Sequence, residues 1–290
     1  MGFFKTLFTG KEETEEEKQE QKKENDFDVF KYDGVKAMQI GKVDYAIACF
    51  DRALAIKDDV ETHRFYANAL LQKNDIEKAI SQLEAVRSAE PENTETILAL
   101  AELYYQTEAY DSLNEACQKA MEINPSLAAP HFILAKMQNV QKDYINAIAQ
   151  LTQAIALKED FADAYLLRAQ VLFSMQQYSE AEKDIDIVIS QDDSNDETLE
   201  MKAECCQALG KNEEAKTYYN KVIELNPYFT KAYLQLGQLL KEEGDTEEAA
   251  KIVEEGLKLQ PDALKDVNGN YTNMETKMQE TYDSINPFKH

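Results

Sequence analysis

Residues 146–157, NAIAQLTQAIAL, place apolar side chains three and four positions apart, which is the spacing of one face of an α-helix. Two of these positions hold alanine, Ala147 and Ala154, where a larger side chain would normally fill a core. The same arrangement returns 34 residues later in SEAEKDIDIVIS, and after a further 34 in EEAKTYYNKVIE. The pattern therefore predicts short amphipathic helices that recur at a fixed period.

Small residues mark the same two places in the units, with Leu113 as the one large exception. The first column is spaced by 33 and then five times by 34, and it contains Gly34, Ala67, Ala101, Ala135, Ala169, Ala203 and Gly237. The second column contains Ala46, Ala79, Leu113, Ala147, Ala181, Ala215 and Ala249. A third column lies four residues further on, on the same helix face, and contains Phe50, Leu83, Cys117, Leu151, Ile185, Tyr219 and Val253. We expect seven helix pairs, in which the small residues let two backbones approach while the larger ones fill the space between units.

The last unit resembles the tetratricopeptide repeat (TPR) family in detail. An aromatic residue, Leu-Gly, a large residue, alanine, a second large residue and proline stand at Tyr233, Leu236, Gly237, Leu240, Ala249, Val253 and Pro261. Seven units in consistent phase carry the resemblance over most of the chain. It implies an all-α fold, a right-handed α-solenoid of about seven helix-turn-helix repeats with a C-terminal capping helix.

The expected organisation has four parts. An apolar segment covers residues 1–10, a charged stretch covers 11–26, the repeats cover 27–263, and a cap with a tail covers 264–290. The individual repeats are expected at 27–59, 60–93, 94–127, 128–161, 162–195, 196–229 and 230–263. Residues 11–26 offer no apolar position to bury, so they form either a solvated helix or a disordered linker. Within the cap, residues 271–285 keep a helical spacing of apolar side chains and are expected to cover the last repeat.

Composition narrows the class of partner. The formal net charge of −24 argues against affinity for nucleic acid or anionic membranes, which require a cationic surface. The four cysteines have neither the spacing of a zinc site nor that of a disulfide framework, which suits buried thiols in a reducing compartment. We expect a cytoplasmic protein with no metal and no cofactor, and the oligomeric state stays open.

A search for catalytic constellations returns no glycine-rich phosphate loop, HExxH motif or nucleophile elbow. His63 and His131 stand where other units have Tyr165 and Tyr233, so we interpret both as packing residues. The chain is therefore expected not to be an enzyme. The rival interpretation, an active site built from surface carboxylates, has no motif to support it.

The family resemblance implies a concave groove lined by the first helix of each pair. Carried over by repeat phase, the candidate ligand-binding residues are Lys31, Arg64, Asn68, Leu98, Tyr105, Phe132, Lys136, Leu166, Gln170 and Phe173. They give a cationic start and an apolar, aromatic middle, followed by an acidic stretch at Glu200 and Glu204. Such a surface is expected to bind a peptide or a helix. The alternative is that some of the aromatic side chains only pack against neighbouring helices.

Some members of the family recognise the C-terminal carboxylate of chaperones through a clamp of lysine, asparagine and arginine residues. Arg64 and Asn68 resemble the first two members of that clamp. The later members fall at Ala99, Ala129 and Ile133, which cannot bind a carboxylate, and this argues against recognition of a chaperone tail.

The apolar start of the chain provides a second candidate contact. Phe3, Phe4, Leu7 and Phe8 fall on one helix face, but the segment is too short for a membrane span. It could dock on the repeats, contact another protein or lie at a membrane interface, although the charged residues behind it are mainly acidic. Our interpretation is a non-enzymatic scaffold that binds a protein or peptide in its groove. The alternative is an assembly factor attached to a membrane or a complex through this segment.

Overall fold

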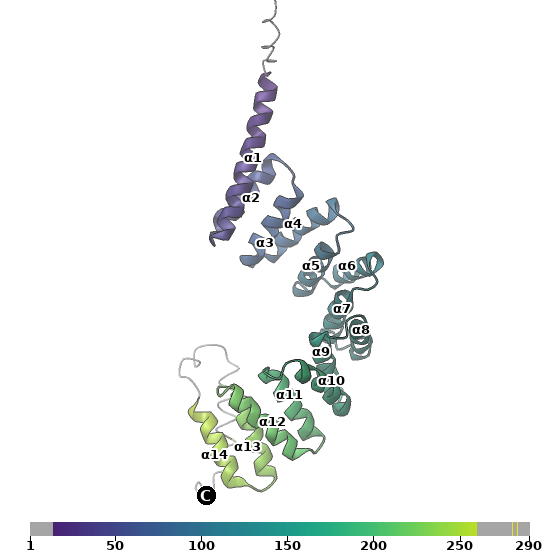
Figure 1. Cartoon of the computed structure of the whole chain (residues 1–290), viewed down its shortest axis with the longest axis vertical. Coiled ribbons are helices and arrows are strands. Elements are labelled where there is room, and N and C mark those ends of the chain that lie inside the picture. Colours follow the sequence, from purple (N-terminus) through teal and green to yellow (C-terminus); the bar gives the residue numbers. More distant parts are fainter. Residues whose placement is uncertain (1–13, 260–279, 281–282, 284–290) are drawn as a thin grey trace, which may run out of the picture. The chain divides into compact units, whose positions relative to one another are not determined.

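The computed structural model describes residues 14–259 together with residues 280 and 283, and this part of the chain is helical without any strand (Figure 1). The fourteen helices that begin within residues 14–259 follow one another in pairs. Their bounds are α1 (Glu15–Gln39), α2 (Val43–Ile56), α3 (Val60–Gln72), α4 (Ile76–Ala89), α5 (Thr94–Gln106), α6 (Tyr110–Ile123), α7 (Ala128–Val140), α8 (Tyr144–Leu157), α9 (Ala162–Ser174), α10 (Tyr178–Gln191), α11 (Asp196–Ala208), α12 (Asn212–Leu225), α13 (Thr230–Glu242) and α14 (Thr246–Lys258). The predicted all-α repeat architecture and the count of seven helix pairs are confirmed.

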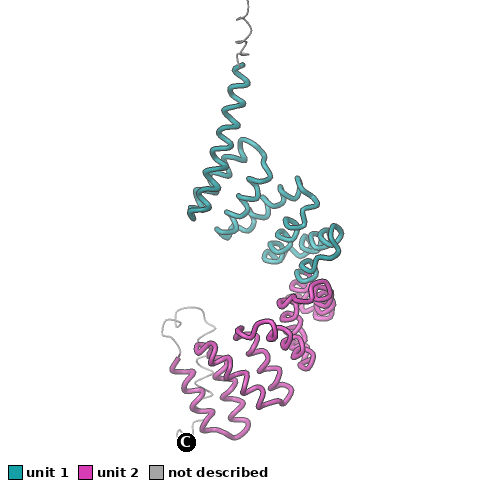
Figure 2. Tube along the Cα trace, viewed as in Figure 1, with its two compact units in different colours: residues 1–133 teal, residues 134–290 magenta. Residues whose placement is uncertain are grey.

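The chain divides into two compact units, residues 1–133 and residues 134–290, and the border lies inside α7 (Figure 2). Within the first unit, each helix from α1 to α5 packs on the next one along the chain. Within the second unit, the same is true from α8 to α13. Within each unit, the second helix of a pair thus packs on its own partner and on the first helix of the following repeat, as expected for stacked units that cannot bury their apolar faces alone.

The turn inside each pair has one conformation throughout. One residue in each turn has a positive φ, and these seven residues are Gly41, Asn74, Glu108, Lys142, Gln176, Gly210 and Gly244. Next to it, a backbone N–H donates to a carbonyl five residues earlier, as in the 2.9 Å bond from Asp75 to Leu70 and the 2.8 Å bond from Lys211 to Cys206. This geometry closes the end of the first helix by satisfying carbonyl groups that have no partner inside the helix.

The start of several first helices is also fixed by the sequence. Asp59, Asn93 and Asn195 precede α3, α5 and α11, and each side chain accepts a hydrogen bond from the backbone N–H three residues later. Such caps each stabilise a helix by about 1 kcal/mol. They place the N-terminal turns of α3, α5 and α11 at the same point of their repeats.

The small columns lie where helices approach most closely, as the sequence predicts. A Cβ atom built on Gly34 would lie 2.5 Å from Cε1 of Phe50, which is fully buried in α2. A Cβ atom on Gly237 would collide with Cγ2 of Val253 in α14. The alanines of both columns are completely buried. The small residues therefore make room for the third column, whose side chains fill the space in front of them.

The charged stretch expected at residues 11–26 is helical from Glu15 onward, so α1 extends well beyond its repeat partner α2. Thr14 and Glu17 form a capping box, in which the side chain of each accepts from the backbone N–H of the other. Glutamate, lysine and glutamine are good helix formers, and Lys18 pairs with Glu15 at 3.3 Å. The apolar segment at residues 1–10 and the cap expected at 271–285 lie outside the described residues, except for residues 280 and 283.

Candidate functional site

The predicted groove residues all lie on the first helices of their pairs. In the first unit these are Lys31 on α1, Arg64 and Asn68 on α3, Leu98 and Tyr105 on α5, and Phe132 on α7. In the second unit they are Lys136 on α7 and Leu166, Gln170 and Phe173 on α9. The two amides, Asn68 and Gln170, are exposed, and the other eight side chains are partly buried. Each unit thus carries its own set of candidate contacts.

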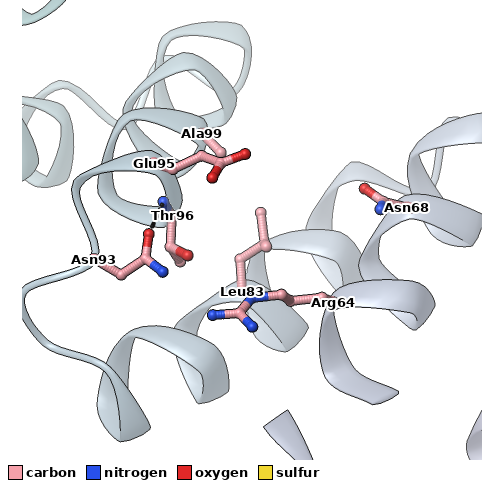
Figure 3. A pocket seen from close by; sticks show the side chains of 7 residues that line it. All are labelled: Arg64, Asn68, Leu83, Asn93, Glu95, Thr96 and Ala99. Carbon is pink, nitrogen blue, oxygen red and sulfur yellow. Dashed lines mark hydrogen bonds between the residues drawn. The ribbon is translucent and has the colours of Figure 1, made fainter. Parts of the chain in front are cut away.

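One hollow in the first unit contains two of these residues (Figure 3). It has a volume of about 410 Å³ and is lined by Arg64, Asn68, Leu83, Asn93, Glu95, Thr96 and Ala99. Arg64 and Asn68 extend from α3, while Glu95, Thr96 and Ala99 belong to the N-terminal turns of α5. The side chain of Leu83, from α4, lies between the two helices. We call this hollow the α3–α5 pocket.

The local sequence fixes the wall that α5 contributes to the pocket. Asn93 caps α5 by accepting a hydrogen bond from the backbone N–H of Thr96 at 3.1 Å, and its own amide donates to Glu90 at 2.8 Å. Arg64 also donates to Glu90. This carboxylate therefore joins the end of α4, the start of α5 and the guanidinium group on α3, which orients Arg64 at the edge of the pocket.

The cations expected at the start of the groove are already paired within the chain. The ammonium group of Lys31 lies 2.9 Å from Asp59 and 2.6 Å from Glu61, and Arg64 pairs with Glu90. Burial lowers the pKa of Lys31, but the two carboxylates more than reverse this effect and leave the pKa above its ordinary value. These positive charges are balanced locally before any ligand binds.

The acidic stretch expected at Glu200 and Glu204 is an ion-paired cluster. Lys231, on the following first helix, lies 2.7 Å from Glu200 and 3.0 Å from Glu204. Burial raises the pKa of Glu200, and the ammonium group of Lys231 offsets this only in part. The two carboxylates thus join neighbouring repeats of the second unit, a role that a search for groove residues does not reveal.

Some predicted contacts also take part in packing. The ring of Phe173 meets that of Tyr178, at the start of α10, edge to face with centroids 5.1 Å apart. His63, which we interpreted as a packing residue, lies between Gln82 and Asp58, with 2.7 Å from a ring nitrogen to each oxygen. At least one aromatic residue predicted to line the groove, Phe173, therefore also packs against a neighbouring helix.

One group of side chains in the described part of the chain has the spacing of metal ligands, namely Glu182, Cys206 and Glu214. Glu182 already accepts hydrogen bonds from Lys202 at 3.0 Å and from Lys211 at 2.8 Å. Burial raises the pKa of the Cys206 thiol to about 11, which keeps it protonated near neutral pH. The donors here serve an ion-pair network, and these residues do not fit a metal ion.

The second predicted contact segment, with Phe3, Phe4, Leu7 and Phe8, lies outside the described residues. Among the helices that the structure describes, none combines the length and the apolar character needed to cross a bilayer.

Comparisons with known proteins identify the repeat. A family model described as tetratricopeptide repeat matches residues 70–112 and 207–268. A model described as anaphase-promoting complex, cyclosome, subunit 3 matches residues 140–222. The chain belongs to the tetratricopeptide repeat family. Proteins of this TPR family act as scaffolds for protein interactions.

Two curated relatives and one solved structure show the extent of the similarity. The chain is 26% identical over 239 residues to the Hsp70-Hsp90 organizing protein of Triticum aestivum, covering 70% of this chain and 41% of that protein. It is 40% identical over 100 residues to the STIP1 homolog of Dictyostelium discoideum, covering 32% of this chain and 18% of that protein. The C-terminal part of a TPR repeat-containing protein from Cytophaga hutchinsonii superposes with a TM-score of 0.66 at 14% identity, covering 84% of this chain and 98% of that structure. The chain spans less than half the length of both curated relatives, and the structural match concerns the fold alone.

Proposed function

We propose that this TPR protein is a non-enzymatic scaffold that binds a peptide or helical segment along its first helices, and that the α3–α5 pocket is a principal contact. The observation that carries the proposal is the pocket itself, which brings a guanidinium group, an amide and a carboxylate from two repeats to one hollow. Such a combination of an apolar base with a few polar groups is typical of a binding site.

The polar groups of the pocket indicate the chemistry of the ligand. Asn68 is exposed and its side chain makes no hydrogen bond within the described residues, so its amide group is available to a peptide backbone. Glu95 is exposed and forms no ion pair with any of the described residues. Arg64, in contrast, is already paired with Glu90. The pocket therefore favours a segment with a basic side chain, and the net charge of −24 favours a basic partner at longer range.

The relatives named for organizing Hsp70 and Hsp90 suggest a chaperone as the partner. The pocket argues for a different ligand. One of the residues that line the pocket is Ala99. Its side chain is a methyl group, whereas the family resemblance places a residue that binds a carboxylate at this position. We therefore propose an internal segment with a basic residue, rather than a free C-terminal carboxylate, as the ligand.

The compartment proposed for this function is the cytoplasm. All four cysteines are buried free thiols, as expected for a protein that folds in a reducing environment.

The test selects peptides from a random-sequence library displayed on phage, with the full chain immobilised, and then measures binding of the selected peptides by isothermal titration calorimetry. Asn68→Ala should weaken binding by about tenfold, as expected for loss of one hydrogen bond to the ligand. Glu95→Lys should reverse the preference for basic residues. The matched control is Asn220→Ala, which removes an exposed asparagine from α12. Binding that is unchanged by both pocket variants would refute the proposal.

A further inference from the structure

The first repeat exposes a face that, in the later repeats, is covered by the preceding repeat. Val29 is 55% exposed, whereas the residues at the same repeat position, Thr62, Thr96, Ala164, Thr198 and Ala232, are at most 5% exposed. Tyr32 is 69% exposed, and the equivalent Phe65 stacks on Phe50 of the preceding repeat with ring centroids 6.1 Å apart. In this structure the first repeat therefore exposes the surface on which, in later repeats, the preceding repeat packs.

This face is apolar at its edges and charged at its centre. Val29, Tyr32, Asp33 and Lys36 on α1, together with Ile40 at its C-terminal cap, fall within an arc of about 100°, at about 100° per residue. Ile40 is 61% exposed. A hollow of about 400 Å³ lies beside it, lined by Asp33, Lys36, Ala37, Ile40, Lys42 and Tyr45. We call these residues, with Val29 and Tyr32, the α1 end face.

The apolar segment at the start of the same chain is poorly placed to cover this face. Phe8 precedes Thr14 by six residues, which span at most about 22 Å when fully extended. Tyr32 lies 18 residues beyond Thr14 along α1, about 27 Å at 1.5 Å per residue, and Ile40 lies about 39 Å away. Phe3 precedes Thr14 by eleven residues, which span at most about 40 Å, so it can reach Tyr32 but reaches Ile40 only as a fully extended chain. Chain length therefore favours an occupant that comes from another molecule.

We propose that the α1 end face binds a second copy of this chain, with the two α1 helices packed antiparallel about a two-fold axis at the level of Gly34 and Val35. In this register Val29 lies opposite Ile40 of the second copy, and Asp33 lies opposite its Lys36. Tyr32 lies opposite its Ala37 and enters the hollow beside it. A two-fold interface brings the same patch of both copies together, so it requires a patch that complements itself.

Charge supports a second copy as the occupant. Two chains that each carry a net charge of −24 repel each other over most of their surfaces. The α1 end face is different, because its hollow is lined by two lysines and one aspartate. Antiparallel packing pairs Asp33 with Lys36 twice, once on each side of the axis, while the apolar contacts lie outside these pairs. This inference is independent of the proposed peptide-binding function.

The test is sedimentation velocity of the full chain over a concentration series. The wild-type protein should form a dimer, and Tyr32→Glu should raise its dissociation constant by about tenfold or more, because a buried aromatic contact is replaced by a charge. The matched control is Ile145→Glu, which places the same charge at a 75% exposed apolar residue of α8 and should leave the dimer intact. Circular dichroism verifies that all variants are folded.

A charge exchange tests the register. Asp33→Lys should weaken the dimer because it places a lysine opposite Lys36 of the second copy, and Asp33→Lys/Lys36→Asp should restore it. A wild-type chain that stays monomeric over the whole series would overturn the proposal, and so would a dimer that is indifferent to Tyr32→Glu and to the charge exchange. A dimer that is lost when residues 1–10 are deleted, but not with Tyr32→Glu, would assign the contact to the apolar segment and would also overturn the proposal.

Discussion

Gly34→Ala provides the sharpest test of how the repeats pack, because two physical effects predict opposite signs. Gly34 lies inside helix α1, and alanine is favoured over glycine in a helix interior by about 1 kcal/mol. If helix propensity dominated, the substitution would stabilise the protein. The structure predicts the reverse, because the added methyl group would meet a side chain that has no free space to move into.

The magnitude follows from the surroundings of Phe50. The new Cβ atom would lie 2.5, 2.7 and 2.9 Å from three ring carbons of Phe50, about 1 Å closer than ordinary contact. The ring is completely buried, and it packs on Phe65 and Tyr66 with centroids 6.1 and 6.3 Å away. Overpacking of this kind costs about 1–3 kcal/mol, and we take the upper half of that range because the ring is enclosed. After the gain in helix propensity, the net destabilisation should be about 1–2 kcal/mol.

The assay is urea denaturation followed by circular dichroism, combined with hydrogen exchange of the α1 and α2 amides. Hydrogen exchange is needed because the ends of a repeat array can unfold before its centre. In a Phe50→Leu background the smaller side chain leaves room for the methyl group, so Gly34→Ala should become neutral or stabilising. The coupling free energy of the double-mutant cycle should then be about 2 kcal/mol. Stabilisation by Gly34→Ala alone, with no coupling to Phe50, would refute the close approach.

Three further predictions concern a charge, a turn and the thiols. Burial raises the pKa of Asp59, but the ammonium group of Lys31 and the Thr62 hydrogen bonds bring it down to about 2, below the value of about 3.8 expected in the unfolded chain. Asp59→Asn, which keeps the helix cap, should therefore lower the unfolding free energy by about 1 kcal/mol above pH 4, and this difference should vanish as the pH of a denaturation series falls through 2. Lys142→Gly should raise the midpoint of thermal unfolding, because Lys142 has a φ of 60° where glycine has no steric cost, with a gain of about 0.5–1 kcal/mol; an unchanged midpoint would contradict this. Burial raises the pKa of the Cys117 thiol to about 12, and all four cysteines are buried, so a thiol reagent should label the protein only after denaturant is added.

The repeat architecture was predictable because it depends on small residues that recur at a fixed distance. Gly34 and Gly237 stand in the same column, and the structure places each of them against the large residue sixteen positions further along the chain, Phe50 or Val253. The constant spacing predicts that both glycines make the same contact, because the same helix pair repeats. The column of left-handed turn residues was accessible in the same way, because Gly41, Gly210 and Gly244 share one phase. Four units hide that signal by placing other residues at this position.

The candidate site was less predictable, because repeat phase gives the position of a side chain and not its partner. Lys31 and Arg64 were expected to form a cationic start of the groove, and both are balanced by carboxylates from the start of α3 or the end of α4. Glu200 and Glu204 were expected as an acidic surface, and Lys231 joins them. These pairs connect residues about 26 to 31 positions apart, and no local pattern marks them. Glu95 of the α3–α5 pocket could be recognised as a carboxylate without an ion pair only once the ion pairs of its neighbours were known.

Helix α10 shows how Arg168 and Lys202, two charged residues on first helices, are accommodated in the stack. Its residues Glu182, Asp184 and Asp186 accept hydrogen bonds from cations on the helices to either side: Asp184 from Arg168 on α9, and the other two from Lys202 on α11. Arg168 donates two bonds to one carboxylate, at 2.7 and 2.8 Å, which fixes its direction as well as its distance. Buried ion pairs add little net stability relative to apolar packing, but they penalise every other alignment by leaving a charge unpaired. A stack of nearly identical repeats can slip or mispair, because neighbouring units resemble one another. The pairs of Lys202 with Glu182 and Asp186 cross from α10 to the next repeat, so they distinguish this boundary between repeats from the others.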